Sequence, residues 1–330
     1  MKETCWVLTG PTASGKTALS LRLARTHDCE IVCMDSMQIY RGMDIGTAKP
    51  TADERVQAVH HMVDVADPTE DFSVARYQEM AESCIADIQA RGHRALLVGG
   101  TGLYLRALRQ PMAMGEAAAD ESIRQELQQI ADAPGGKAMT TTHGADSLPQ
   151  QIADAPGGKE QLHQQLAAVD PDTAQRLHLN DVRRVIRALE VYRLTGRPFS
   201  QQPQIKTDSR FCYRVASLTM PRDILYARIE QRIDQMLADG LAEEVSRLLK
   251  SGVPRDAKAM KAIGYKEMIP YALGETTLDE AVYALKLNTR HYAKRQLTWM
   301  RREEDVLWVD ALEPDAYDKL EAYYTQGEAK

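Results

Sequence analysis

One string of eight residues, GPTASGKT at positions 10–17, constrains the fold of this chain more than any other feature. It fits the pattern G-x-x-x-x-G-K-[ST] and lies between an apolar run at 6–9 and a segment whose apolar residues have helical spacing. A strand, a glycine-rich loop and a helix in this order point backbone N–H groups and the positive end of a helix dipole at phosphate oxygens. The string therefore predicts a polyphosphate ligand at the end of a buried strand.

The loop supplies a full set of phosphate-binding groups. Lys16 would add a positive charge, and the Thr17 hydroxyl would be a ligand for Mg²⁺, the predicted cofactor. Kinases, nucleotide hydrolases and enzymes that use prenyl diphosphates all employ such a loop, so the string alone does not identify the ligand. The predicted phosphate-binding residues are Gly10, Pro11, Thr12, Ala13, Ser14, Gly15, Lys16 and Thr17.

Strands and helices are expected to alternate along the chain. Apolar runs at 31–34 and 95–98 are predicted strands, and residues 74–90 have the pattern of an amphipathic helix. This order predicts an α/β fold with a mostly parallel, P-loop NTPase-like sheet flanked by helices, whose ligands bind at the carboxyl ends of the strands. Further along, one long helix is expected over 227–250, ending before Gly252 and Pro254.

A change of composition divides the chain. Residues 117–210 are rich in Gln and Ala in helical segments, which predicts an inserted all-helical domain between a first part of the catalytic core, 1–116, and its remainder, 211–330. Within the insertion, QQIADAPGGK occurs at 128–137 and again at 150–159. We interpret this repeat as a tandem duplication with a surface loop between the two copies.

A single carboxylate follows the second predicted strand. The strand at 95–98 ends in Gly99 and Gly100, whereas the strand at 31–34 is followed by Asp35. Because the carboxyl ends of parallel strands share one edge of the sheet, Asp35 is expected to face the glycine-rich loop. Its carboxylate could bind Mg²⁺ or act as a general base, and a strand-end cap is the purely structural alternative.

Composition argues against several classes of protein. No stretch approaches the roughly 18 apolar residues of a membrane span, and the five scattered cysteines fit neither a zinc site nor a redox motif, so a cytoplasmic protein is expected.

The net charge of −6 argues against nucleic acid as a partner, but residues 286–302 contain six basic residues and no acidic one. This basic run is either a solvated helix face or a local nucleic-acid-binding surface: Lys286, Arg290, Lys294, Arg295, Arg301 and Arg302.

Several strings, in the same order along the chain, resemble the tRNA dimethylallyltransferase (tRNA isopentenyltransferase) family. After GPTASGKT come DSMQIYRGMDIGTAKP at 35–50, HHMVDVADP at 60–68 and LLVGGTGLY at 96–104. They are followed by NDVRRVIRALEVY at 180–192, KAIGYKE at 261–267 and AKRQLTWMR at 293–301. One string could mislead, whereas the ordered set spans nearly the whole chain. Only the duplicated block at 138–159 departs from the family's pattern.

This resemblance implies transfer of a dimethylallyl group from dimethylallyl diphosphate to N6 of adenosine 37, beside the tRNA anticodon, with Mg²⁺ and release of diphosphate. The allylic carbon develops carbocation character as the diphosphate leaves. Catalysis therefore depends mainly on neutralising the charge of the departing diphosphate. The resemblance assigns this task to the loop, to Thr101 and to Arg222. For Arg222 the alternative is an ordinary surface charge that follows a proline. Asp35 is the predicted acceptor of the proton that the adenine amine loses.

The target base must leave its stack to reach a buried site, which suits a single-stranded anticodon loop. By the same resemblance, three segments are predicted to contact the anticodon stem-loop, with Gln38 as a candidate to read a base edge. A solvated helix face is the alternative for the arginines at 183–187. We expect a monomer that acts away from any membrane. The predicted tRNA-contacting residues are Asp35, Ser36, Met37, Gln38, Arg183, Arg184, Val185, Ile186, Arg187, Lys261, Ala262, Ile263, Gly264, Tyr265 and Lys266.

Two other classes of function could use the same loop. A small-molecule or nucleoside kinase would bind ATP there and yield a phosphorylated product. A nucleotide-switched RNA-binding module would bind tRNA without modifying it. Incubation with labelled dimethylallyl diphosphate and unmodified tRNA separates all three hypotheses.

Overall fold

The chain folds as two compact units in the computed structural model, which describes residues 3–110, 120–134, 157–202 and 208–326. Unit 1 combines Met1–Pro111 with Asp208–Lys330, and unit 2 is Met112–Thr207. The change of composition placed the insertion at 117–210, a few residues later at both ends. Most of the duplicated segment 128–159 lies outside the described residues.

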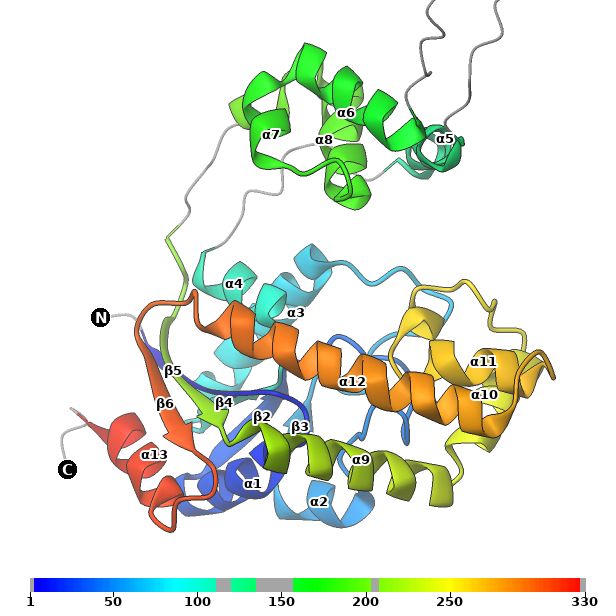
Figure 1. Ribbon diagram of the computed structural model, residues 1–330. Coiled ribbons are helices and arrows are strands. Elements are labelled where there is room, and N and C mark those ends of the chain that lie inside the picture. The colour runs from blue at the N-terminus through cyan, green and yellow to red at the C-terminus, as the bar shows by residue number, and fades with distance from the viewer. Residues whose placement is uncertain (1–2, 111–119, 135–156, 203–207, 327–330) are drawn as a thin grey trace, which may run out of the picture. The chain divides into compact units, whose positions relative to one another are not determined.

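Unit 1 is built on a six-stranded sheet in the order β3-β2-β4-β1-β5-β6, in which every neighbouring pair is parallel (Figure 1). The strands expected at 6–9, 31–34 and 95–98 are β1, β2 and β4, so the predicted mostly parallel sheet is confirmed. The bounds of the strands are β1 Thr4–Thr9, β2 Cys29–Cys33, β3 His60–His61, β4 Arg94–Val98, β5 Cys212–Thr219 and β6 Val306–Asp310.

Helices cover both faces of the sheet, because alternate residues of a strand point to opposite sides. Trp6 and Leu8 of β1 pack beneath α1 (Lys16–His27) and α13 (Ala316–Thr325), where Trp6 stacks on Tyr324 with 4.9 Å between the ring centroids. Cys5 and Val7 join the larger core on the opposite face.

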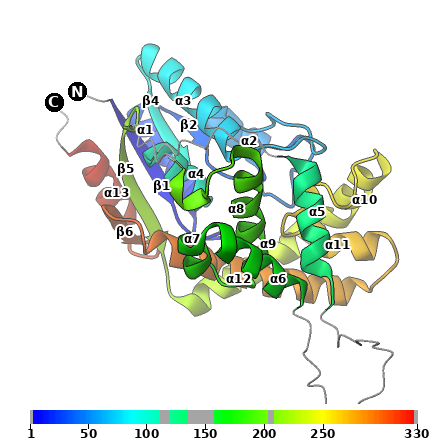
Figure 2. The same cartoon turned by 90° about the horizontal axis from the view of Figure 1, so that it is seen from above.

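The larger core is enclosed mainly by helices that come from both parts of unit 1. The predicted helix at 74–90 is α3 (Val74–Ala90), which packs beside α4 (Gly102–Arg109). The longest helix of the described residues, α12 (Leu278–Met300), runs alongside α9 (Arg222–Ala238) and α11 (Tyr265–Ala272) in both views (Figures 1 and 2). The remaining helices of unit 1 are α2 (Ala52–Gln57), α9 (Arg222–Ala238), α10 (Leu241–Lys250), α11 (Tyr265–Ala272) and a 3-10 turn at Ala259–Lys261.

The prediction of one long helix over 227–250 is wrong. The chain forms two helices there, because Asp239 ends α9 and Gly240, with φ +98°, adopts the left-handed conformation before α10 begins. Leu241, Val245 and Leu248 lie at helical spacing on α10 and are buried. The apolar pattern of the predicted helix is therefore correct, but Gly240 lets the chain turn between two separate helices that both face the core.

The described residues of unit 2 are all helical or irregular, which confirms the predicted helical insertion. Its helices are α5 (Glu121–Asp132), α6 (Gly158–Val169), α7 (Pro171–Arg176) and α8 (Val182–Thr195), with a 3-10 turn at Phe199–Gln201. Leu127, Leu162, Leu166 and Leu189 form the centre of a separate hydrophobic core. Within the described residues, unit 2 therefore has a hydrophobic core of its own.

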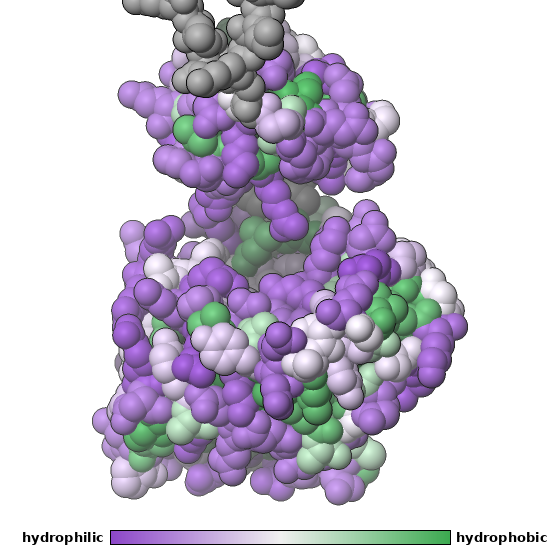
Figure 3. Space-filling view, turned by 45° about the vertical axis from the view of Figure 1, so that its right-hand side comes forward, coloured by the Kyte–Doolittle hydropathy of each residue, from purple (hydrophilic) through white to green (hydrophobic). Residues whose placement is uncertain are grey.

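The surface is mainly polar on the face that Figure 3 presents, with small apolar patches between hydrophilic side chains. Among the described residues, no helix is both long enough and apolar enough to cross a membrane.

Candidate active site

The predicted phosphate-binding loop connects β1 to α1, as its sequence predicts. Gly10 has φ +140°, and a Cβ there would lie 2.9 Å from the backbone oxygen of Leu218 on β5, so a side chain does not fit. The Lys16 ammonium turns back over the loop and donates to the carbonyl oxygens of Gly10 at 3.0 Å and Pro11 at 2.7 Å. In this structure the loop carbonyl oxygens of Gly10 and Pro11 therefore bind the ammonium of Lys16, the first residue of α1.

Lys16 lies near charges from two other elements. Its pKa is lowered to about 8, chiefly by burial and also by the cation of Arg232 on α9, while the Asp35 carboxylate acts in the opposite direction. Burial likewise lowers the pKa of Arg232, and Asp35 opposes this. Two cations and one carboxylate therefore meet at the loop.

Asp35 follows β2 and is oriented by the backbone after it. Its Oδ1 accepts the N–H of Met37 at 2.8 Å. The residue between them, Ser36, donates its N–H to the Thr101 hydroxyl at 3.0 Å, and Thr101 precedes α4 at the end of the β4 segment. The predicted residues Lys16, Asp35 and Thr101 therefore come from the ends of β1, β2 and β4 and gather at one edge of the sheet.

Two side chains of α12 that the sequence analysis did not single out also reach this edge. Gln296 is buried, its Oε1 accepts the Thr12 N–H at 3.0 Å, and its Nε2 donates to the Gly100 carbonyl at 3.0 Å. The Tyr292 hydroxyl lies one turn earlier, near Thr101 and Gln296, and burial raises its pKa. Gln296 therefore joins the phosphate loop to the loop after β4. Its signal in the sequence is an uncharged polar residue on the buried face of a basic helix.

Two arginines of α9 occupy different positions. Arg222, a predicted catalytic residue, is exposed at the first position of the helix and makes no ion pair with the described residues. It follows β5, which pairs with β1, so it is located at the same edge as the loop. Arg232 was missed by the sequence analysis, yet it is partly buried and its guanidinium reaches the Thr12 hydroxyl at 3.5 Å. Nothing in the local sequence distinguishes it from the other arginines of α9.

A buried glutamate holds the loop that follows Asp35. Glu244 of α10 accepts three consecutive backbone N–H groups, from residues 44–46, at 2.9 to 3.1 Å and the Tyr265 hydroxyl at 2.5 Å. A Cβ on Gly46 would lie 2.5 Å from the Tyr265 ring, so the chain needs glycine there. Strings at 35–50 and 261–267 that are far apart in sequence thus form one structural unit.

The same loop contains a buried lysine whose role the sequence did not reveal. Lys49 donates to the Asp44 carboxylate at 2.7 Å, to the Asp64 carboxylate at 2.5 Å and to the Tyr40 carbonyl. Its charge is therefore satisfied within the chain, which assigns Lys49 and Asp44 to loop structure.

Gln38 is similarly occupied. Its amide donates to the carbonyl oxygens of Thr47 at 3.1 Å and Ala48 at 2.9 Å, and its oxygen accepts the Cys33 thiol at 3.2 Å. Contact with a base edge would require Gln38 to give up some of these bonds.

The other predicted tRNA contacts divide by exposure. Of the 183–187 segment, Val185 and Ile186 lie in the core of unit 2, and Arg187 pairs with the buried Glu190 at 2.7 Å. Five of the predicted positions are buried, so a contact of their side chains with RNA stays a prediction: Val185, Ile186, Ala262, Gly264 and Tyr265. The exposed positions that remain available are Arg183, Arg184, Lys261 and Lys266.

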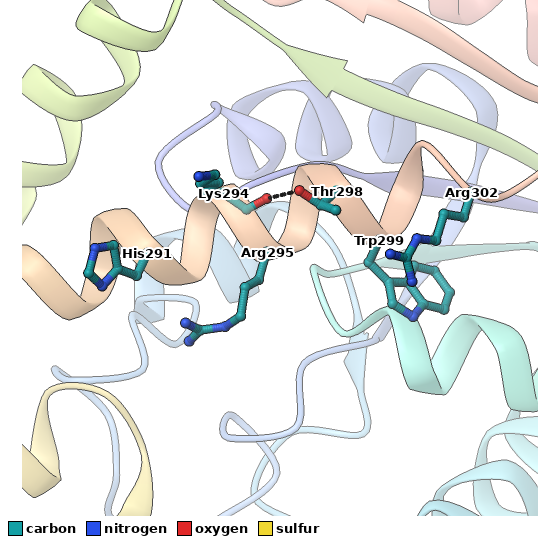
Figure 4. Close-up of a pocket in the computed structure, with 6 residues that line it drawn as sticks. All are labelled: His291, Lys294, Arg295, Thr298, Trp299 and Arg302. Carbon is teal, nitrogen blue, oxygen red and sulfur yellow. Dashed lines mark hydrogen bonds between the residues drawn. The ribbon is translucent and has the colours of Figure 1, made fainter. Parts of the chain in front are cut away.

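The basic run on α12 has two parts. Lys286 and Arg290 are paired across to α9, with Asp234 at 2.6 Å and Glu230 at 3.0 Å. Three cations of the second part, Lys294, Arg295 and Arg302, line a pocket of about 370 Å³. Trp299 packs there against the start of α4 with Arg302 beside it, and Lys294 and Arg295 project from earlier positions on α12 (Figure 4). The lining residues of the pocket are His291, Lys294, Arg295, Thr298, Trp299 and Arg302.

The donors near the loop suit Mg²⁺ only together with a ligand. The Thr17 hydroxyl is exposed at the start of α1, and the Asp35 carboxylate faces the loop. Across the described ranges, no group of three or more His, Cys, Asp or Glu side chains could hold a metal ion. Mg²⁺ is commonly bound by one or two protein oxygens with waters and substrate phosphates, so this set fits a cation that binds with a diphosphate.

Comparison with known families gives a consistent match. A family profile described as IPP transferase matches residues 38–303, and one described as isopentenyl transferase matches residues 3–65. A tRNA dimethylallyltransferase of Geobacter metallireducens is 46% identical over 316 residues, covering 95% of this chain and 94% of its own length. One from Geobacillus thermodenitrificans is 46% identical over 319 residues, covering 96% and 93%.

Solved structures agree with the sequences. The tRNA isopentenylpyrophosphate transferase of Bacillus halodurans matches with a TM-score of 0.66 and 41% identity, covering 98% of this chain and 95% of that one. A eukaryotic dimethylallyltransferase described as acting on tRNA matches with a TM-score of 0.71 and 26% identity, covering 98% of this chain and 77% of that one.

Proposed function

Because this chain belongs to the tRNA dimethylallyltransferase family, we propose that it transfers a dimethylallyl group from dimethylallyl diphosphate to N6 of adenosine 37 in tRNA and releases diphosphate. The observation that supports this most directly is that Lys16 and Asp35 follow β1 and β2 at one edge of the sheet, where the Asp35 carboxylate is near enough to raise the pKa of Lys16. The Asp35 carboxylate can receive a proton, and the Lys16 ammonium can bind the leaving group. A phosphate loop alone would supply the second function but not the first.

Binding of the diphosphate begins with the groups of the loop. The backbone N–H groups at the start of α1 point toward the phosphate site, and the Lys16 ammonium exchanges its bonds to the Gly10 and Pro11 carbonyls for bonds to the diphosphate. The Thr17 hydroxyl would hold Mg²⁺ together with the diphosphate oxygens, and Mg²⁺ when bound adds positive charge beside the diphosphate. The loop thus stabilises negative charge that grows as the leaving group departs.

Transfer forms one bond and breaks another. The bond between the allylic carbon and the diphosphate oxygen breaks, and its electron pair leaves with the diphosphate. The lone pair of adenine N6 forms the new carbon–nitrogen bond, and the proton that N6 loses passes to the Asp35 carboxylate. Thr101 would position Asp35 through the Ser36 N–H, while Arg222 would add charge at the outer side of the leaving group.

The tRNA is bound through exposed cations. Lys294 and Arg295 flank the pocket on α12, and Lys261 and Lys266 are exposed near α11. Each would bind backbone phosphate, and the indole of Trp299 offers a surface on which an unpaired base could stack. Arg183 and Arg184 of unit 2 offer further cations. We further propose that the protein acts as a monomer in the cytoplasm, where its five free cysteines would stay reduced.

The test is incubation with radiolabelled dimethylallyl diphosphate, Mg²⁺ and tRNA that lacks the modification, followed by nucleoside analysis. Label in N6-dimethylallyladenosine at position 37 is expected, with one diphosphate released per label. A tRNA with guanosine at position 37 is the matched control and should remain unlabelled. A phosphorylated product from ATP, with no label in tRNA, would instead identify a kinase.

A further inference from the structure

Gln296 is a buried side chain of α12 that lies between the phosphate loop and the loop after β4. We propose that Gln296 is a positioning residue, which sets the separation between the phosphate loop and the Asp35 carboxylate. This inference rests on the proposed function, because the separation matters only if a leaving group is held by the loop while the carboxylate accepts a proton.

The amide of Gln296 makes one hydrogen bond to each loop. Its Oε1 accepts the Thr12 N–H at 3.0 Å, and its Nε2 donates to the Gly100 carbonyl oxygen at 3.0 Å. Both partners are backbone groups, one a donor and one an acceptor, so they fix which end of the amide faces which loop. The position of Gln296 is supported by Ala293 and Met300, about one turn before and after it, which are buried in the larger core.

Gly100 leaves the space that this amide fills. A Cβ at Gly100 would lie 2.0 Å from Nε2 of Gln296 and 3.3 Å from the carbonyl oxygen of Gly10. The second distance shows how closely the phosphate loop approaches the loop after β4. The φ of Gly100 lies outside the left-handed region, so the amide of Gln296, and not the backbone conformation, requires a glycine here.

The bond to Gly100 continues toward Asp35 through the next residue. Thr101 donates its N–H to the Met34 carbonyl at 3.2 Å, and its hydroxyl accepts the Ser36 N–H at 3.0 Å. Thr101 therefore binds the backbone immediately before and immediately after Asp35. Because Gly100 and Thr101 share a peptide bond, a shift of Gly100 would be passed on to the Asp35 carboxylate.

The bond to Thr12 reaches the segment that holds Lys16. Thr12 follows Gly10 and Pro11, whose carbonyl oxygens accept the Lys16 ammonium at 3.0 and 2.7 Å. One side chain of α12 thus connects the backbone that binds Lys16 with the backbone that carries Asp35. A primary amide suits this connection because it offers a donor and an acceptor side by side, whereas a carboxylate only accepts and an ammonium only donates.

The separation matters to the rate because transfer uses both groups in one reaction. The diphosphate is held by the phosphate loop as the allylic carbon–oxygen bond breaks, and the proton of N6 passes to the Asp35 carboxylate. Pyrophosphate alone needs the loop and not the carboxylate, and the tRNA is bound through exposed cations. Misplacement of reacting groups by about 1 Å lowers a rate by about 10²-fold. Loss of the Gln296 amide should therefore lower kcat and leave both KM values almost unchanged.

The experiment compares Gln296→Met with the wild type and with Gln78→Met. Methionine keeps the length and the apolar stem of glutamine but forms neither hydrogen bond. Gln78 is partly buried, and its amide donates to Glu82 within α3 at 3.1 Å. We measure kcat, the KM for dimethylallyl diphosphate, the KM for tRNA, and the affinity for pyrophosphate with Mg²⁺ by calorimetry.

We expect kcat of Gln296→Met to fall by about tenfold to a hundredfold, with both KM values and the pyrophosphate affinity within about threefold of the wild type. Gln78→Met should match the wild type in all four quantities. Gly100→Ala tests the same connection without changing Gln296, because the added methyl group displaces the amide. It should show the same fall in kcat at unchanged KM values, and it replaces Gln296→Met if that variant does not fold.

The possible results separate the explanations. If Gln296→Met transfers dimethylallyl with the kcat of the wild type, the positioning role is refuted and the proposed function stands. If its pyrophosphate affinity falls as far as its kcat, Gln296 only shapes the phosphate loop, and the positioning role is refuted as well. If the wild type binds pyrophosphate but transfers no dimethylallyl to tRNA, the proposed function fails and the inference about Gln296 fails with it.

Discussion

Replacing Lys16 by methionine should abolish transfer and yet stabilise the free protein at neutral pH. The Lys16 side chain is partly buried near Arg232, and its pKa is lowered from 10.5 to about 8. Folding therefore works against the charge that the enzyme needs for its ligand. Methionine has a similar length and keeps the apolar stem, but it carries no charge into the loop.

The magnitude follows from the pKa. At pH 7 Lys16 is charged in both the folded and the unfolded chain, so the shift of its pKa corresponds to a cost of about 3 kcal/mol to the folded state. The two hydrogen bonds to the Gly10 and Pro11 carbonyls offset this by on the order of 1 kcal/mol each. A net gain of about 1 kcal/mol for Lys16→Met is expected, which would raise the melting temperature by about 2–4 °C.

The dependence on pH gives the sharper test. Between about pH 8 and 10.5 the folded chain releases the Lys16 proton while the unfolded chain retains it, so the stability of the wild type rises with pH. By pH 9.5 the wild type should gain about 2 kcal/mol relative to Lys16→Met, and the order of the two stabilities should reverse.

Urea unfolding at pH 7.0 and 9.5, without Mg²⁺ or ligand, measures both free energies. The three tryptophans, Trp6, Trp299 and Trp308, all lie in unit 1, so their fluorescence reports on the unit that contains Lys16. Lys250→Met removes an exposed lysine from the end of α10 and is the matched control. A difference between wild type and Lys16→Met that stays the same at both pH values would refute the reasoning. Transfer by Lys16→Met should fall by about a hundredfold or more.

Three further changes test other parts of the site. Asp35→Asn should reduce single-turnover transfer by about 10²-fold or more while pyrophosphate affinity stays within a few-fold of wild type, and normal transfer would exclude a general base at this position. Glu244→Ala leaves three backbone N–H groups without their acceptor. The free energy of unfolding, measured in urea, should therefore fall by about 2–4 kcal/mol, and a loss below about 1 kcal/mol would contradict the structural role of Glu244. The double variant Lys294→Gln, Arg295→Gln should weaken tRNA binding in filter-binding titrations. The slope of log K against log salt should become smaller by about one to two units, because two phosphate contacts are lost. If its slope equals that of the control variant Lys250→Gln, neither residue contacts the RNA.

The local parts of the fold were predictable because short-range chemistry sets them. The GPTASGKT string specifies a strand, a loop and a helix through its glycines and its flanking apolar residues, and these elements formed where expected. The helix at 74–90 agreed with α3 at both ends, since Ser73 caps its start and its apolar face is continuous. The prediction failed at Gly240, because an apolar stripe that continues in register does not reveal a turn between two helices.

The sequence by itself therefore determined which chemical groups meet at the predicted phosphate site: the loop, Lys16, and a carboxylate at the end of the next strand. Only the tertiary structure decided what surrounds them. Arg232 lies 220 residues from Thr12, Gln296 lies 284 residues from Thr12, and Glu244 lies 199 residues from Ile45, so each contact depends on how α9, α10 and α12 pack against the sheet. Local sequence carries no record of such contacts, because a partner hundreds of residues away is selected by packing and not by propensity.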